Sequence, residues 1–406
     1  MFPATVLVAI LTGFDVGVTL FGSGLATIVA LLGSGMRIPL YYGSSFSYIG
    51  AVVAVVGAEW GGLRVAQGGI VATAVISVLA GFLIRWVGKE ALDRVLPPMV
   101  TGSVAIVIGV SLATTALGQA ADHWGVSIFT LLMTVLFSVY LRGRGFISMV
   151  PILLGAVSGY LLAVALGVVS FEVVAQADWL RVPAFSTPIF KWQAIAAIAP
   201  IAIATIPEST AHLYQIGLYV DRLAEDLGRP PLRIQRLIGL NLILDGIGDA
   251  INGLLGGCAG TNYGENNSLM AITRNYSCPV LVAAGAIAIL LSFVGKLGAL
   301  IQTLPTAVTG GMAIYLFGVI ALQGVALIQS EEVDLFDARQ LAIGAVILIV
   351  GIGGSMLEGG AIPIVIPWLG PAFADGLPAI ATAAVLGMLL NLIFLLVPPR
   401  EVTPQS

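Results

Sequence analysis

The sequence contains very little charge, histidine or cysteine for its length. Only 9% of its 406 residues are charged, against about 25% in soluble globular domains, which excludes an ordinary water-soluble fold. Two histidines cannot build a usual zinc site, and the two cysteines, Cys258 and Cys278, are too few for a disulfide framework. A net charge of −4 without a basic stripe excludes nucleic acid as a partner. We therefore expect no metal and no cofactor, and we interpret both thiols as small packing residues.

Apolar residues and glycine are abundant instead. The chain is 58% hydrophobic with 50 glycines, and its mean hydropathy is +1.05. A membrane-spanning helix needs about 20 apolar residues, and such stretches follow one another with short connections. They predict an all-α polytopic membrane protein with fourteen spans, near 1–12, 17–34, 46–57, 66–87, 99–117, 125–141, 147–169, 193–215, 236–255, 265–274, 278–300, 306–328, 338–353 and 376–397.

Two of these spans are short. Those near 46 and 265 each follow a segment of Gly, Ser, Thr, Asn and Tyr that is typical of extended chain, so both predict broken helices. The stretch from Met1 to Leu11 covers about half of a hydrocarbon core. No cationic residue precedes Arg37, which argues against a cleaved signal peptide. We expect either that the true start lies upstream or that this span is incomplete.

Positive charge is distributed unequally between the two sides of the predicted membrane. With the N-terminus inside, thirteen of the 17 Lys and Arg residues fall on one side and four on the other. The thirteen are Arg37, Arg85, Lys89, Arg94, Arg142, Arg144, Arg222, Arg229, Arg233, Arg236, Arg274, Arg339 and Arg400, and the four are Arg64, Arg181, Lys191 and Lys296. Because positive loops stay in the cytoplasm, both termini are predicted to be cytoplasmic.

The two halves of the sequence repeat each other. The segment 96–106, LPPMVTGSVAI, matches 304–314, LPTAVTGGMAI, at seven positions. Two further echoes keep the same order, the tripeptide Val-Gly-Lys at 87–89 and 294–296, and Tyr-Gly at 42–43 and 263–264. Seven spans per half force the two copies into opposite orientations. Inverted repeats of this kind place the substrate site at the repeat interface, between discontinuous helices.

A carboxylate and an imidazole lie one turn apart inside an apolar span. Glu208 and His212 are four residues apart, hence on one helical face, and Pro207 loosens the backbone beside them. Such a pair can exchange a proton, because imidazole titrates closest to physiological pH. The alternative interpretation is a structural hydrogen-bonded pair.

A second carboxylate, Glu265, begins the second broken helix, where free N–H groups favour anions or carbonyl oxygens. An acid at membrane depth is costly and by default marks a substrate or ion path. Phe46 occupies the equivalent position of the first repeat. Two helix N-termini then offer backbone donors while Glu208 and Glu265 offer acceptors, which suits a flat heterocycle with alternating N–H and C=O groups.

Two further acids, Asp245 and Asp249, lie one turn apart and are predicted to tether the extended segments or to belong to a proton route. Asp15 and Arg274 are expected near the membrane interface, without a functional role. No hydrolase, phosphate-loop or metal constellation is present in the sequence, so we predict that the protein is not an enzyme.

These residues resemble the nucleobase/ascorbate transporters, and among them the bacterial proton-coupled uracil permeases. The resemblance covers nearly the whole chain. It is carried by Tyr42-Gly43-Ser44-Ser45-Phe46, by the pair Glu208 and His212, and by Tyr263-Gly264-Glu265-Asn266. It implies a core domain of residues 1–90 and 191–302, a gate domain of 91–190 and 303–406, a homodimer, and an elevator-like movement of the core.

The resemblance also implies roles for individual residues. Glu208 and Glu265 bind the base, backbone N–H groups near Phe46 and Gly264 bind its carbonyl groups, and Tyr263 and Ala4 line the pocket. His212, with Glu208, couples transport to protons. The supporting residues are Asn266, Asp245 and Ser45.

The cargo implied is uracil, imported by proton symport, with three alternatives left open. The first is xanthine, urate or another purine, since Asp245 is similar to the acid of xanthine-type members and Ser268 stands where the family motif usually has Gly. The second is an anion exchanger or channel-like protein of the same fold. The third is a nucleobase receptor that does not transport.

Overall fold

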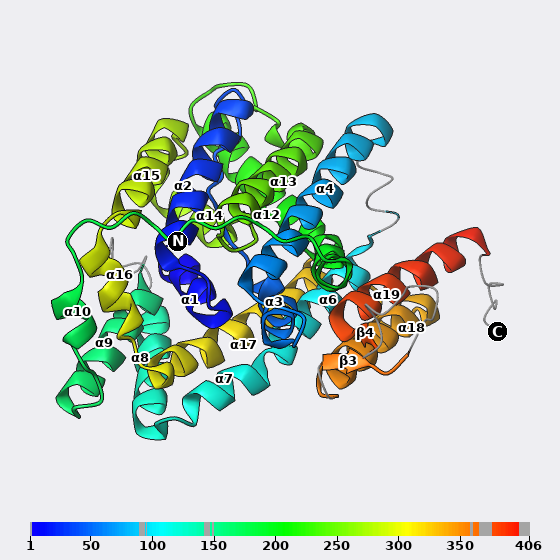
Figure 1. Cartoon of the computed structure of the whole chain (residues 1–406). Coiled ribbons are helices and arrows are strands. Elements are labelled where there is room, and N and C mark those ends of the chain that lie inside the picture. The colour runs from blue at the N-terminus through cyan, green and yellow to red at the C-terminus, as the bar shows by residue number, and fades with distance from the viewer. Residues whose placement is uncertain are drawn as a thin grey trace. The chain divides into compact units, whose positions relative to one another are not determined.

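The computed structural model describes residues 2–88, 94, 96–141, 147, 150–357, 360–364 and 376–397. Of residues 2, 3, 204, 265, 268 and 272 it describes the backbone alone. The described chain is mainly helical, with a few very short strands (Figure 1).

The first half comprises α1 (Phe2–Thr12), α2 (Val16–Gly33), β1 (Tyr42–Ser44), the 3-10 helix η1 (Phe46–Tyr48), α3 (Ile49–Gly57), α4 (Leu63–Val87), α6 (Pro98–Ser111), α7 (Ala113–Ala120), α8 (Trp124–Tyr140), α9 (Pro151–Ala165) and α10 (Glu172–Gln176). The second half comprises α11 (Trp192–Ile198), η3 (Ala199–Ile201), α12 (Ala202–Asp226), η4 (Ile234–Leu237), α13 (Ile238–Leu255), β2 (Gly260–Asn262), α14 (Gly264–Thr273), α15 (Cys278–Ser292), α16 (Gly295–Gln302), α17 (Thr306–Ser330), α18 (Ala338–Leu348), the π-helix η5 (Ile349–Gly353), β3 (Ala361–Ile362), β4 (Leu377–Pro378) and α19 (Ala379–Leu396).

The predicted fold class is confirmed. Each of the fourteen predicted spans contains a helix. Seven described helices are long and apolar enough to cross a membrane by length and composition, and five shorter apolar ones accompany them. The two spans predicted as broken are short helices, α3 and α14, each preceded by a three-residue strand.

Several predicted spans differ from the structure in their bounds; that at 99–117, for example, is divided into α6 and α7. The span predicted at 278–300 is divided into α15 and α16, because the backbone around Val294 pairs with an extended segment instead of continuing the helix. There the Arg181 N–H donates to the Phe293 carbonyl over 2.9 Å and the Gly295 N–H to the Trp179 carbonyl over 3.0 Å. The span predicted at 193–215 continues as α12 to Asp226, since hydropathy detects only the apolar part of a helix that extends beyond it.

Residue contacts divide the chain into two compact units, one of Met1–Trp86 with Leu112–Gly318 and the other of Val87–Ser111 with Val319–Ser406. In the first unit α2 packs against α13 and α15, and α8 packs against α9. In the second, α18 packs against α6 and α19. The predicted core and gate boundaries stay a prediction.

Glycine lets α2 and α15 approach closely. A β-carbon on Gly24 would lie 2.5 Å from the carbonyl oxygen of Gly285, so a larger residue would push the helices apart. Small residues at such contacts are a common means of packing helices in membranes.

In the first unit the strands β1 and β2 pair with each other, and β1 precedes η1 and α3 while β2 precedes α14. They pair antiparallel, with Tyr42 opposite Asn262, Gly43 opposite Thr261 and Ser44 opposite Gly260. Equivalent segments of two inverted copies must run antiparallel when they pair, and these strands do. The pairing brings together the two halves of the sequence at the point where each half has a broken helix.

Candidate functional site

Two helix N-termini emerge from the β1 and β2 pair. Ser45 caps η1, with its side chain accepting the Ser47 N–H over 3.3 Å. The Ser45 N–H itself donates to the Ala259 carbonyl over 3.0 Å. On the other strand, the Tyr263 N–H donates to the Tyr41 carbonyl over 2.9 Å just before α14 begins. Each short helix therefore begins directly after one strand of the pair, and free N–H groups in a first helical turn favour carbonyl oxygens or negative charge.

Glu208 lies beside the first of these helix ends. It is half-buried on α12, directly after Pro207, which lies inside that helix. The Ser47 hydroxyl donates to Oε2 of Glu208 over 3.3 Å. One turn earlier, Thr205 hydrogen-bonds the Tyr48 hydroxyl over 3.2 Å. These two contacts fix the Glu208 face of α12 against η1.

His212 lies against the second helix end. Its Nδ1 is 2.9 Å from the Asn262 carbonyl oxygen and 3.0 Å from the Asn262 side-chain oxygen. A carbonyl oxygen only accepts, so Nδ1 carries a proton, and in the neutral ring Nε2 keeps a lone pair. A β-carbon on Gly264 would lie 2.5 Å from Cδ2 of this ring. His212 thus covers the first residue of α14, and only glycine leaves it room.

A buried polar network fixes the residue that orients His212. The Asn262 side-chain N–H groups donate to Ser209 over 2.8 Å, to Asp245 over 3.2 Å and to Asn241 over 3.3 Å. All three acceptors lie on the amide nitrogen's side, so the amide oxygen is the atom that faces His212. The Ser209 hydroxyl donates to Asp245 in turn.

The two acids of α13 both bond to the strands. Asp245 accepts from Thr261 over 3.4 Å as well as from Asn262. Asp249 accepts the Tyr42 hydroxyl over 2.7 Å and the Gly260 N–H over 2.8 Å, and so contacts both β1 and β2. These are the contacts that a tethering role requires.

Tyr263 connects β1 to α1 through its hydroxyl group. Its hydroxyl donates to the Ser44 carbonyl over 2.9 Å and lies 3.0 Å from the Thr5 hydroxyl. The ring is buried over Gly43, whose β-carbon would lie 2.5 Å from the ring atom Cζ. Ala4 is half-buried and adjoins Thr5 on α1, so the end of α1 that carries Ala4 reaches this region.

The structure brings most of the predicted site residues into one region. Phe46 is buried, edge-on to Phe317 with ring centroids 6.1 Å apart. Asn266 is buried, and its side-chain nitrogen has no hydrogen-bond partner among the described residues. The side chain of Glu265 lies outside the described residues, although its backbone occupies the first turn of α14. The substrate-binding and proton-coupling roles of all these residues stay predictions.

Sequence reasoning missed several polar residues here. Ser209, Asn262 and Ser47 bond to the predicted site residues Asp245, His212 and Glu208, and Asn241 bonds to Ser209 and Asn262. One signal was available, because Asn241 precedes Asp245 by four residues and therefore shares its helical face. Cys258 and Cys278 are free and buried, as expected of packing residues.

Residues 1–359 match the sequence model of the permease family. A uracil permease of Bacillus caldolyticus is 38% identical over 408 residues, which cover 97% of this chain and 89% of the relative. The uracil permease of Escherichia coli strain K12 is 36% identical, over 99% of this chain and 91% of the relative. The putative pyrimidine permease RutG of the same strain is 35% identical over 100% of this chain and 90% of the relative.

Two solved structures resemble the chain in fold. The transmembrane domain of the cyanobacterial bicarbonate transporter BicA aligns with a TM-score of 0.58 and 16% identity, over 88% of this chain and 93% of that one. SLC26A9 aligns with a TM-score of 0.58 and 14% identity, over 97% of this chain and 63% of that one. At these identities the likeness shows a shared fold alone.

Proposed function

Since the chain belongs to the permease family, the nucleobase/ascorbate transporters, we propose that its cargo is uracil and that uracil enters the cell together with protons. A permease moves its cargo unchanged, so the chain is a transporter and not an enzyme. The relatives named as uracil permeases match over nearly its whole length, which supports uracil as the cargo.

One structural observation supports the proposed uracil-binding site. β1 pairs with β2, and of the two short helices that follow these strands, η1 begins beside Glu208 and α14 begins beside His212. Uracil is a flat ring with two N–H donors and two carbonyl acceptors in alternation. In the proposed complex its carbonyl groups accept from backbone N–H groups at Phe46 and Gly264, and its N–H groups donate to Glu208 and Glu265. Tyr263 and Ala4 line the pocket.

The geometry of His212 supports a proton-coupling role. Nδ1 is committed to Asn262, which leaves Nε2 as the atom that gains or loses a proton. We propose that a proton taken up by His212 and Glu208 neutralises the acid while the loaded site crosses the membrane, because moving a charged group through a bilayer is costly.

The test is uptake of radiolabelled uracil into proteoliposomes. We expect uptake to rise when an inward proton gradient is imposed and to collapse with an uncoupler. An equal response to a sodium gradient, or uptake indifferent to both gradients, would contradict proton symport. Glu265→Ala should abolish uracil binding in calorimetry, whereas His212→Ala should weaken gradient-driven uptake more than binding.

Competition tests the alternative cargo. Labelled uracil uptake is measured against an excess of unlabelled uracil, xanthine, urate and hypoxanthine. We expect only uracil to compete strongly. Stronger competition by a purine would contradict uracil as the cargo and would support a purine permease of the same fold.

We also propose a homodimer in the bacterial cytoplasmic membrane, with both termini cytoplasmic and with residues 1–90 and 191–302 moving as an elevator. Native mass spectrometry should find two chains per particle. Labelling of a cysteine placed at Ser47 tests the movement. Access from each side of the membrane in turn is expected, and access from one side under every condition would refute it.

A further inference from the structure

An extended segment of the first unit connects α10 to α11. Residues 178–191, here called the strap, are not helical, and Leu180 within them forms an antiparallel bridge with Val294. The resemblance to the transporter family assigns most of the strap to the gate domain, which is predicted to run to residue 190. The hydrogen bonds of the strap run instead to elements of the predicted core.

The backbone of the strap is bonded to three core helices. Near its start, the bridge at Leu180 joins it to the residues that follow α15. In its middle, the Ser186 N–H donates to the carbonyl of Leu255, the last residue of α13, over 3.0 Å. Toward its end, the Ile189 N–H donates to the carbonyl of Arg64 in the first turn of α4 over 2.7 Å. The strap is thus held along its whole length.

The four cations that are predicted on the outer side of the membrane also bond in this region. Positive charge is scarce on that side, and these cations are Arg64, Arg181, Lys191 and Lys296. The guanidinium group of Arg64 on α4 donates to the carbonyl of Thr187 over 2.9 Å and to its hydroxyl over 2.8 Å. Arg181 in the strap pairs with Asp15, which caps α2, over 3.4 Å.

The two lysines act at the ends of the strap. Lys191, its last residue, donates to the Trp60 carbonyl, between α3 and α4, over 2.6 Å. Lys296 on α16 donates to the carbonyls of Val174 and Ala175 on α10, just before the strap, over 2.5 and 3.1 Å. Exposed ion pairs are individually weak, so the strap is fixed by their number and by their spread over several helices.

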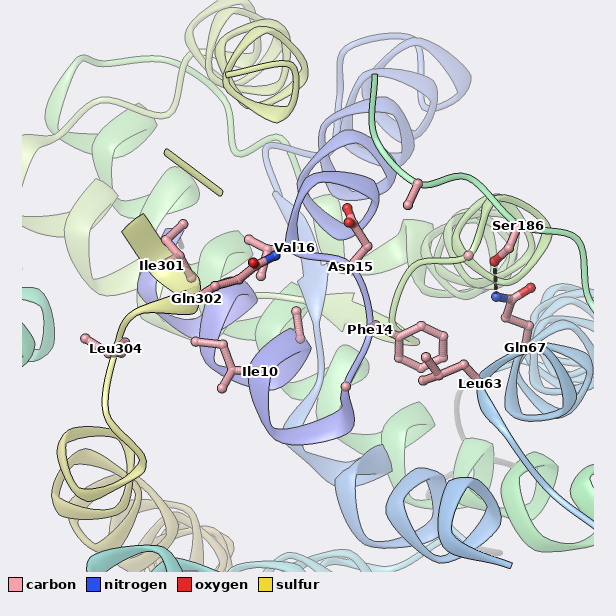
Figure 2. A pocket seen from close by; sticks show the side chains of 14 residues that line it. Ile10, Phe14, Asp15, Val16, Leu63, Gln67, Ser186, Ile301, Gln302 and Leu304 are labelled. Carbon is pink, nitrogen blue, oxygen red and sulfur yellow. Dashed lines mark hydrogen bonds between the residues drawn. The ribbon is translucent and has the colours of Figure 1, made fainter. Parts of the chain in front are cut away.

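Side chains of the strap add two further contacts. Phe185 packs edge-on against Phe21 of α2, with ring centroids 5.1 Å apart. Ser186 hydrogen-bonds the side chain of Gln67 on α4 over 2.6 Å, and with Ala184 it lines a cavity of about 460 Å³ (Figure 2). A lid over this cavity would lie in the same place. A lid must leave, however, whereas the strap is bonded to several core helices at once.

We propose that the strap is a fixed part of the moving core, which holds the outer ends of α2, α4 and α13 together and stays bonded to them while uracil is transported. This inference rests on the proposed function, and it places the joint between gate and core before residue 178. The acids Asp245 and Asp249, which bond to β1 and β2, lie on α13. The strap therefore keeps the strand pair and the helices around it in one body.

A disulfide across the bridge tests whether the strap can stay closed during transport. Leu180 and Val294 lie directly opposite each other, and the hydrogen bonds beside them join their neighbours. The Cα atoms of such a pair lie about 4.5 Å apart, which suits a disulfide. In the double variant Leu180→Cys with Val294→Cys, oxidation should consume both new thiols and leave gradient-driven uracil uptake into proteoliposomes unchanged. Each single variant is a matched control, because it cannot form the bridge.

Hydrogen exchange of the wild type in nanodiscs gives an independent readout. Peptides covering residues 178–191 should exchange equally slowly with and without uracil. Arg64→Met should speed their exchange about threefold or more, because it removes both bonds to Thr187. The matched control Arg37→Met removes a cation on the opposite predicted side, where it bonds the Ser34 carbonyl, and should leave exchange of the strap unchanged.

Three results would overturn the inference. They are a loss of uptake on oxidation that a reductant restores, failure of the cysteine pair to form a disulfide in the folded protein, and faster exchange of the strap when uracil binds. A wild type that neither binds nor takes up uracil would overturn the proposed function instead, so the two failures are distinguishable.

Discussion

Substitution of Gly264 by alanine tests the packing of His212 on the second helix end. The added β-carbon would lie 2.5 Å from Cδ2 of the ring, whereas ordinary contacts begin at 3.4 Å. The ring or the first turn of α14 must therefore move by roughly 1 Å. A shift of that size is enough to break the 2.9 Å bond between Nδ1 and the Asn262 carbonyl.

The expected penalty follows from the overpacking. Inserting a methyl group into a well-packed site costs about 1 to 3 kcal/mol. If this strain falls on the bound state, uracil affinity drops by about 5- to 150-fold. Calorimetric titration of Gly264→Ala in detergent measures the affinity, and the melting temperature reports any part of the strain that falls on the fold.

Two comparisons make the test specific. Gly118→Ala is the control, because a β-carbon on that helical glycine meets nothing within 4 Å and should leave affinity unchanged. In a His212→Ala background the imidazole is gone, so adding Gly264→Ala should cost little more. Wild-type affinity and stability in Gly264→Ala, or the same penalty with and without His212, would refute the reasoning.

Three further predictions concern the strands, the first helix end and the thiols. Asp249→Ala should lower the melting temperature clearly more than Tyr42→Phe does, because the first change leaves two buried donors unpaired and the second removes one hydrogen bond. Equal decreases in melting temperature would contradict the role of Asp249 in tethering β1 and β2. Ser47→Ala should weaken uracil binding about two- to tenfold, as Glu208 loses a donor that positions it, and calorimetry unable to separate it from wild type would exclude that role. Both cysteines are buried, so a thiol reagent should label neither in the folded protein and both in denaturant, and fast labelling of the native chain would show the packing to be wrong.

Much of the fold was predictable because its signals are local. Apolar length identifies a span from its own residues, and glycine with polar residues marks the places where a span is broken. The repeat in the sequence likewise implied the inversion, since an odd number of spans separates its copies. The break at Val294 was not predictable, because it depends on hydrogen bonds to the segment at 179–181.

The candidate site was predictable in its residue types and less so in its contacts. Glu208 and His212 were found from their spacing in an apolar helix. That His212 is oriented by Asn262 and rests on Gly264 depends on how β2 lies against α12, and no spacing within α12 contains that information.

Sequence by itself determined that this chain is a helical membrane protein with a duplicated, inverted architecture and acids inside apolar helices. Tertiary structure alone decided which polar groups meet, from the strand pair of Tyr42 and Asn262 to the buried amide of Gln67. The physical reason is that hydrophobic length is a property of neighbouring residues. Hydrogen bonding in the site joins segments as many as 258 residues apart, as between Thr5 and Tyr263, and their register is set only when the helices pack.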